Sequence, residues 1–94
     1  MSDDARRPTL ARRARLRWDA ARAQHVVVVP EGVLALSAEG AEVAALLDGR
    51  RSVAAVIDAL AEAHPEAPRE VIGGDVRDFV GRLVARGYVT LEAP

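Results

Sequence analysis

The sequence contains no cysteine and no lysine, and only 3% of its 94 residues are aromatic. The absence of cysteine excludes disulfide bonds, thiolate metal sites and cysteine catalysis. No apolar run approaches the ~20 residues of a membrane-spanning helix, and no apolar stretch follows the N-terminal arginines as it would in a secretory signal. We therefore expect a cytoplasmic protein that does not bind membranes.

The composition is that of one small globular domain with an uneven charge. Half of the residues are apolar, and alanine and valine supply most of them, so the core must be built from small side chains. Residues 1–22 hold seven arginines and three acids, a net charge of +4, whereas the rest of the chain holds six arginines and eleven acids, a net charge of −5. Positive charge is therefore concentrated at the N-terminal end.

The first residues have no regular pattern. Residues 1–11 are polar and charged, lack periodicity and are interrupted by Pro8, which predicts a disordered tail. The folded domain is then expected over residues 12–92.

Three short strands are predicted at the start of this domain. Residues 14–18 alternate at the strand period of two, with Leu16 and Trp18 on one face. Residues 25–29 (His-Val-Val-Val-Val) are almost entirely β-branched and predict the clearest strand. The Pro-Glu-Gly sequence at residues 30–32 favours a tight reversal, so residues 33–36 should return as the second arm of a hairpin. The three strands should form one antiparallel sheet.

Three helices should follow the strands. Ser37 and Ser52 are good N-caps for the first two helices, which end near Asp48-Gly49 and His64-Pro65. The third helix runs from Pro68 to Arg86, and residues 88–91 form an extended finish that could add to the sheet. Three short strands followed by three helices indicate an α+β, winged-helix-like fold.

Nothing in the chain assembles into a catalytic or metal-binding pattern. His25 and His64 each lack a second ligand at helical spacing. Gly73-Gly74 lacks the third glycine and the preceding strand of a nucleotide-binding fingerprint. Asp75 and Asp78 share a helix face, which a solvated surface explains better than acid–base chemistry. A hidden enzyme or cofactor carrier is therefore disfavoured, and we expect a non-catalytic binding protein without a metal or cofactor.

A small winged-helix DNA-binding regulator is the main alternative. The third helix carries four arginines against three acids, and the pI of the chain is about 6.1. Affinity for duplex DNA depends on neutralising several phosphates, and domains that read DNA have a clearly basic face. The charge therefore disfavours nucleic acid as the partner.

The sheet offers a different binding mode. Residues 33–37 carry no charge, which is unusual for the exposed edge of a sheet. An open edge accepts an extended peptide as a further strand, and an apolar helix beside it completes a groove. The alternative that Val33, Leu34 and Leu36 are simply core residues stays open for the inward-facing members.

An ordered set of residues also resembles the pyrroloquinoline quinone biosynthesis protein D family, PqqD. The resemblance extends from about Leu10 to Leu91. It is carried by Arg15-Leu16-Arg17-Trp18-Asp19, Arg22, Val26 to Val29 with Pro30-Glu31-Gly32, Leu36, Ala41, Asp48-Gly49-Arg50, Val53, Ile57, Leu60, Asp75-Val76, Phe79, Leu83 and Gly87-Tyr88-Val89.

This resemblance implies a winged-helix domain that recognises a ribosomally made precursor peptide and has no DNA function. By analogy, the partner would be the precursor peptide PqqA, which the chain would present to PqqE, the radical SAM enzyme that links a glutamate to a tyrosine within it. The peptide is expected to lie against Val33, Leu34, Ala35, Leu36 and Ser37 of the third strand and against Ile72, Asp75, Val76 and Phe79 of the third helix.

Overall fold

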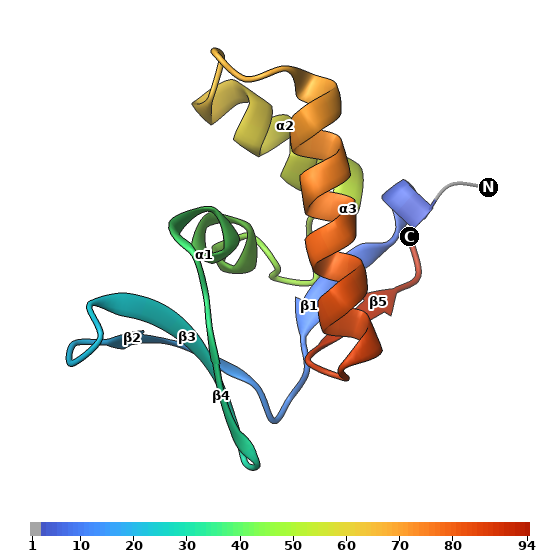
Figure 1. Cartoon of the computed structure of the whole chain (residues 1–94). Coiled ribbons are helices and arrows are strands. Elements are labelled where there is room, and N and C mark those ends of the chain that lie inside the picture. The colour runs from blue at the N-terminus through green and yellow to red at the C-terminus, as the bar shows by residue number, and fades with distance from the viewer. Residues whose placement is uncertain (1–2) are drawn as a thin grey trace.

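Residues 3–94 are described by the structure, a computed structural model with mixed strands and helices (Figure 1). Met1 and Ser2 of the predicted tail lie outside the described residues. In chain order the elements are η1 (Asp3–Ala5, a 3-10 helix), β1 (Arg7–Leu10), β2 (Arg15–Asp19), β3 (Gln24–Val29), β4 (Gly32–Ala35), α1 (Ala38–Ala45), α2 (Val53–Ala63), α3 (Arg69–Ala85) and β5 (Val89–Glu92). The α+β class is confirmed; β1 is a strand that the sequence did not predict, and β5 corresponds to the predicted extended finish.

The three predicted strands form an antiparallel sheet in the order β2-β3-β4. The register places Val27 of β3 opposite Leu34 of β4. The turn between β2 and β3 is fixed by Asp19, whose Oδ1 accepts hydrogen bonds from the backbone N–H groups of Ala21 and Arg22 at 3.1 and 3.2 Å. Because β3 is in the middle, β2 and β4 are the two edges of the sheet.

The prediction of a disordered tail is wrong for residues 7–10, which form β1 and pair antiparallel with β5. The Pro8 side chain is fully buried, and its carbonyl accepts a hydrogen bond from the Gly49 N–H at 3.0 Å. Proline is tolerated because β1 has a single neighbouring strand and needs ladder donors on one side only. The folded unit therefore begins before residue 12.

The extended finish predicted at residues 88–91 is the strand β5, but it does not join β2–β4. It pairs with β1 in a separate two-stranded sheet, with Pro8 opposite Leu91 and Leu10 opposite Val89. In Figure 1 this pair passes behind the C-terminal half of α3. The two ends of the chain are thereby tied together.

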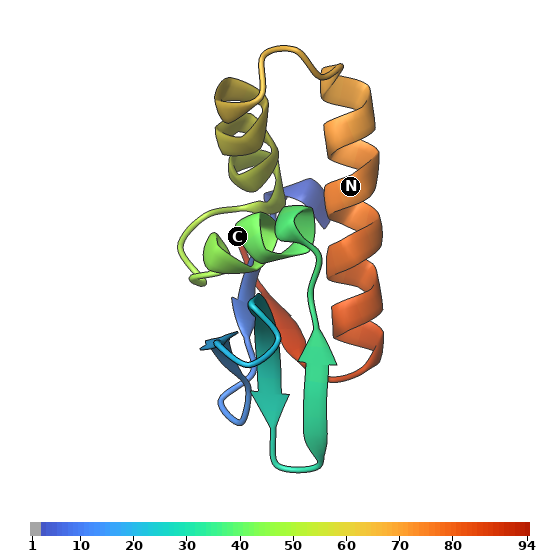
Figure 2. The same cartoon turned by 60° about the vertical axis from the view of Figure 1, so that its left-hand side comes forward.

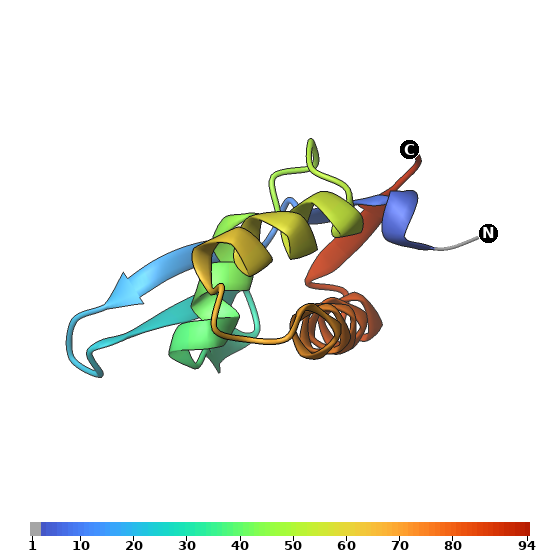
Figure 3. The same cartoon turned by 90° about the horizontal axis from the view of Figure 1, so that it is seen from above.

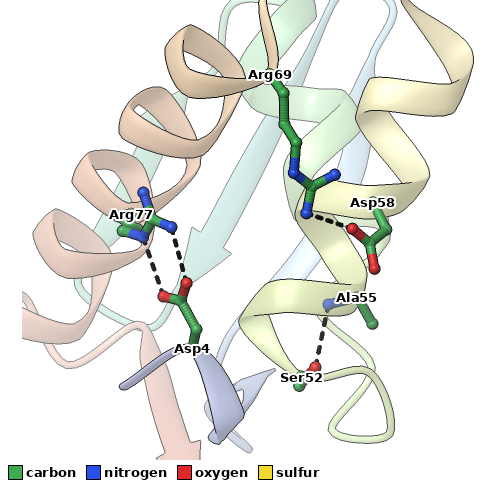
Figure 4. Close-up of polar contacts among 6 residues, drawn as sticks. All are labelled: Asp4, Ser52, Ala55, Asp58, Arg69 and Arg77. Atoms are coloured by element: carbon green, nitrogen blue, oxygen red, sulfur yellow. Dashed lines mark hydrogen bonds and ion pairs between the residues drawn. The ribbon is translucent and has the colours of Figure 1, made fainter. Parts of the chain in front are cut away.

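The first two helices begin at the predicted caps. Ser37 Oγ accepts a hydrogen bond from the Gly40 N–H at 3.0 Å. Ser52 Oγ accepts one from the Ala55 N–H, also at 3.0 Å (Figure 4). These bonds satisfy backbone donors of the first turn that have no partner within the helix.

The end of α1 differs from the prediction. The helix stops at Ala45 rather than at Asp48-Gly49, because its last turn tightens into bonds from the Leu46 and Leu47 N–H groups to the carbonyls three residues before them. Asp48 then forms a separate turn, in which its Oδ1 accepts hydrogen bonds from the N–H groups of Arg50 (2.9 Å) and Arg51 (3.0 Å). These two N–H groups, that of Arg51 first, hold the pKa of Asp48 below its usual value.

Two clusters of buried apolar side chains form the core. The larger joins α1, α2, α3 and β5, and the smaller lies between the β2–β4 sheet and α1. Half-buried Leu10, Leu34, Phe79 and Tyr88 pack against both clusters. These four side chains connect the two halves of the core.

Arginine contacts hold α3 in place. Arg77 donates to both carboxylate oxygens of Asp4, from Nε at 3.0 Å and from Nη2 at 2.7 Å, and Arg69 pairs with Asp58 of α2 (Figure 4). Figure 3, in which α3 is seen almost end-on, shows α1 and α2 on one side of it.

None of the helices within residues 3–94 is long and apolar enough to cross a bilayer.

Candidate functional site

One edge of β4 pairs with no strand among residues 3–94 and offers backbone groups for a further strand. The Leu36 N–H donates to the His25 carbonyl at 3.0 Å, so Leu36 directs its backbone groups toward β3. Backbone groups alternate in direction along an antiparallel strand, so the N–H and C=O of Val33 and Ala35 point away from β3. These two residues therefore present donors and acceptors at the open edge.

A hollow lies between this edge and the C-terminal half of α3, which run alongside one another in Figure 2. Its floor is apolar, and two arginines of α3 stand at its rim. The residues that line this strand-side hollow are Leu34, Ala35, Leu36, Ser37, Phe79, Arg82, Leu83 and Arg86.

A second, central hollow continues from the first between α1 and α3. The two share Ser37, Phe79 and Arg82. The Phe79 ring packs so closely on Gly40 that a Cβ at residue 40 would lie 3.1 Å from its Cε1 atom. Glycine at this position lets α1 approach α3, and a side chain here would require the Phe79 ring to shift by a few tenths of an ångström.

A third, helix-side hollow lies where α1, α2 and α3 meet, and it shares Glu39, Val43 and Asp75 with the central one. Its floor is mostly apolar and its rim is acidic. The lining residues are Glu39, Glu42, Val43, Leu60, His64, Glu66, Ala67, Val71, Ile72, Asp75 and Val76. The three hollows form one continuous groove along α3, called here the β4–α3 groove.

Exposed apolar side chains mark both ends of this groove. Val33 at the β4 edge is 54% exposed, and Val71 in the helix-side hollow is also 54% exposed. The third large apolar side chain that is exposed among residues 3–94 is Trp18 of β2, at the other edge of the sheet. Exposed apolar patches are typical of binding surfaces.

The structure brings eight of the nine predicted site residues into the lining of the groove and places the ninth, Val33, on the edge strand beside it. They differ in accessibility. Leu36 and Val76 are buried, at 5% and 1% exposure, so they can act only as floor. Leu34, Ile72 and Phe79 are half-buried, whereas Val33, Ala35, Ser37 and Asp75 are exposed.

The sequence prediction missed charged residues along the groove: Glu39, Asp78, Arg82 and Arg86. On α3, the residues Asp75, Asp78, Arg82 and Arg86 follow one another at spacings of three or four, which places them on one helix face. With Asp75 predicted as a site residue, that periodicity could have identified Asp78, Arg82 and Arg86 as well. Glu39 lies on another helix, and no local pattern connects it to α3.

The groove carries opposite charges at its two ends. Arg82 and Arg86 line the strand-side hollow, whereas Glu39 and Asp75 line the helix-side hollow. Within residues 3–94 none of these four side chains forms a salt bridge, and neither does Asp78. These charges are therefore available to a bound molecule.

His64 closes the helix-side hollow from α2. Its Nε2 lies 2.8 Å from Glu42 Oε2 of α1, and its Nδ1 lies 3.6 Å from Glu66 Oε2. The hydrogen bond that the His64 ring donates to Glu42, followed by the negative charge of that carboxylate, raises the pKa of His64 above its ordinary value of 6.5. When it is protonated, the imidazole forms an ion pair that links α1 to the end of α2.

We expect Glu42→Gln to lower the pKa of His64, because the neutral amide no longer favours the imidazolium. The pKa of His64 is higher in the folded state than in the unfolded state. The contact with Glu42 therefore stabilises the fold fully below the unfolded-state pKa, and this stabilisation is lost as the pH rises through the folded-state pKa. An NMR titration of the His64 ring resonances between pH 5 and pH 9 measures the change. Glu39→Gln is the matched control and should leave the His64 pKa in place; equal shifts in both variants would contradict the assignment to Glu42.

Within residues 3–94, no group of three or more His, Asp or Glu side chains is arranged to hold a metal ion. What the groove provides instead is a backbone edge, an apolar floor and separated charges. This combination is suited to holding an extended peptide.

Comparison with known proteins gives the groove a family context. The family model described as "Coenzyme PQQ synthesis protein D (PqqD)" matches residues 24–89, well over half of the chain. The chain belongs to the PqqD family. A relative named "PqqA binding protein" from Rhodopseudomonas palustris (strain TIE-1) is 44% identical over 84 residues, covering 89% of this chain and 81% of the relative. The "PqqA binding protein" of Klebsiella pneumoniae (strain 342) is 39% identical over 80 residues, or 85% of each chain.

A solved structure of the PqqD family has the same architecture. The solution NMR structure of the PqqD truncation of Methylobacterium extorquens PqqCD superposes with a TM-score of 0.78 at 28% identity, covering 95% of this chain and 93% of that one. It is described as a functional and stand-alone recognition element for ribosomally synthesized and post-translationally modified peptides. The family predicted from the sequence is therefore confirmed, and PqqD is a family of recognition proteins.

Proposed function

We propose that this PqqD-family chain is a non-catalytic peptide chaperone that binds the precursor peptide PqqA by strand addition at β4. The observation that carries the proposal is an uncharged strand edge that has no partner strand within residues 3–94 and faces a groove with an apolar floor. Relatives named "PqqA binding protein" and a family member described as a peptide recognition element support it.

In this proposal the peptide backbone forms hydrogen bonds with Val33 and Ala35, and these bonds supply sequence-independent affinity. Side chains of an added strand alternate between two faces, so every second peptide residue points into the groove. The half-buried Leu34 and Phe79 would contact those side chains, with Leu36 beneath them as floor. On α3 the peptide would pass Ile72, Asp75 and Phe79, with Val76 as floor.

We further propose that the bound peptide is presented to the radical SAM enzyme PqqE. The sheet has two edges, and a peptide on β4 leaves the β2 edge uncovered. Trp18 on β2 is 59% exposed and packs edge-on against His25. The chain can therefore hold the peptide on one edge of the sheet and contact an enzyme through another surface.

Adding a synthetic PqqA peptide to the labelled protein should shift the backbone amide resonances of residues 33–37 and 72–79, because these segments flank the groove. A heteronuclear NMR titration at low and high salt measures the response, with random duplex DNA of equal concentration as the control ligand. Shifts confined to the arginines of residues 1–22, or an equal response to DNA, would indicate general charge attraction and overturn the proposal.

A further inference from the structure

The helix-side hollow is an accessible apolar surface that backbone pairing with β4 alone does not fill. Its floor includes the half-buried Ile72, and beside it Val71 is 54% exposed. It is continuous with the strand-side hollow through the central hollow, so a chain lying on β4 has an open path toward it. The molecule best placed to fill the helix-side hollow is therefore a peptide that is already bound along β4.

The charges at the two ends define the chemistry of that occupant. Glu39 and Asp75 lie at the helix-side end, and Arg82 and Arg86 lie at the strand-side end. None of these four side chains has a salt-bridge partner among residues 3–94. A bound peptide with the opposite charge order would pair with both ends. A peptide in the reverse order would place like charges together, which is unfavourable.

We propose that the peptide bound at β4 continues into the helix-side hollow, where it places an apolar side chain next to a lysine or arginine, while an acidic residue elsewhere in the peptide pairs with Arg82 and Arg86. This inference rests on the proposed function and adds a second subsite and a charge order to it. The groove would thus select the register of the peptide, which backbone hydrogen bonds alone do not fix.

The geometry of α3 sets the spacing between the two subsites. Ile72 and Arg82 are ten residues apart, which corresponds to ~15 Å along a helix that rises ~1.5 Å per residue. An extended peptide covers ~3.3 Å per residue, so the apolar anchor and the acidic residue should be separated by about five positions. Such a ligand must be longer than the segment that pairs with β4.

The first test uses Val71→Asp in the full-length protein, because Val71 is exposed and its replacement should not disturb folding. The probes are a synthetic PqqA peptide and a series of the same peptide shortened from each end. Val71→Asp should weaken binding of the full peptide by about tenfold, comparable to ~1.4 kcal/mol. It should not affect a shortened peptide that still shifts the amides of residues 33–37. Equal affinity of the full peptide for Val71→Asp and the unchanged protein would overturn the second subsite.

The second test addresses the charge order by combining protein and peptide variants. Asp75→Arg and Arg82→Glu are each measured against PqqA peptides in which single charged residues are neutralised, with Glu62→Arg on α2 as the matched control. Each groove variant should show a coupling of about three- to fivefold with one peptide position, as expected for exposed ion pairs. A coupling absent from both groove variants, or equal to that of Glu62→Arg, would overturn the charge order.

Failure of the proposed function and failure of the helix-side subsite would give different results. If the peptide does not shift the amides of β4 at all, strand addition and the proposed function are wrong. If β4 responds while Val71→Asp and the charge variants behave like Glu62→Arg, strand addition holds and the helix-side subsite is wrong.

Discussion

A chain that begins at Ala11 should lose most of its free energy of unfolding, although it lacks only ten residues of polar appearance. The deletion removes β1, exposes Val89 of β5 and eliminates the backbone bonds from Gly49 to Pro8 and from Val53 to Arg6. Burial of an apolar side chain such as Leu10 is worth ~1.5–3 kcal/mol and each backbone hydrogen bond ~0.5–1.5 kcal/mol. We therefore expect a loss of about 5 kcal/mol, which is comparable to the whole stability of a small domain.

Thermal and urea denaturation monitored by circular dichroism measure this loss. The matched control removes Ala93 and Pro94, which follow β5 and are exposed, and it should leave the melting temperature within a few degrees. If the chain starting at Ala11 melts like the control, β1 is not part of the cooperative unit and the disordered tail expected from the sequence is the better description.

The helices could be predicted from the sequence because their signals are local. The Ser37 and Ser52 caps and the apolar stripes that follow them lie within one or two turns of the structures that they determine. The β1–β5 pair could not be predicted in the same way. Four residues that include a proline carry no strand period, and their partner lies some eighty residues away in the chain, so the pairing depends on tertiary structure.

The groove was predictable in part for a similar reason. The lack of charge at residues 33–37 and the apolar stripe of α3 are visible in the sequence, and together they indicate an edge beside a helix. Sequence periodicity alone did not distinguish floor from rim, since Val76 and Phe79 belong to the same stripe and differ in burial. The helix-side hollow depends on how α1 packs against α3, which Gly40 and the Phe79 ring determine.

Ala35→Pro should weaken binding of the PqqA peptide by ten- to a hundredfold while the domain stays folded. The N–H of Ala35 points away from β3, so proline removes no bond of the existing sheet and deprives an added strand of one donor. A peptide carbonyl buried in the groove would then lack a partner, which costs ~1–3 kcal/mol in addition to the lost bond. Proline is compatible with an edge strand, and its preference for an extended preceding residue suits Leu34.

Isothermal titration of the peptide beside a thermal melt of each variant measures the two effects separately. Ala35→Val is the matched control, because it keeps the N–H, suits a strand and should bind the peptide within a fewfold of the unchanged protein. A reciprocal probe covers the case in which proline disturbs the hairpin: peptides N-methylated at successive positions should lose affinity at alternate residues only, those whose N–H faces β4. Uniform tolerance of N-methylation, or normal peptide binding by a folded Ala35→Pro variant, would show that the peptide does not add to the sheet, because a ladder of backbone hydrogen bonds cannot form without these donors.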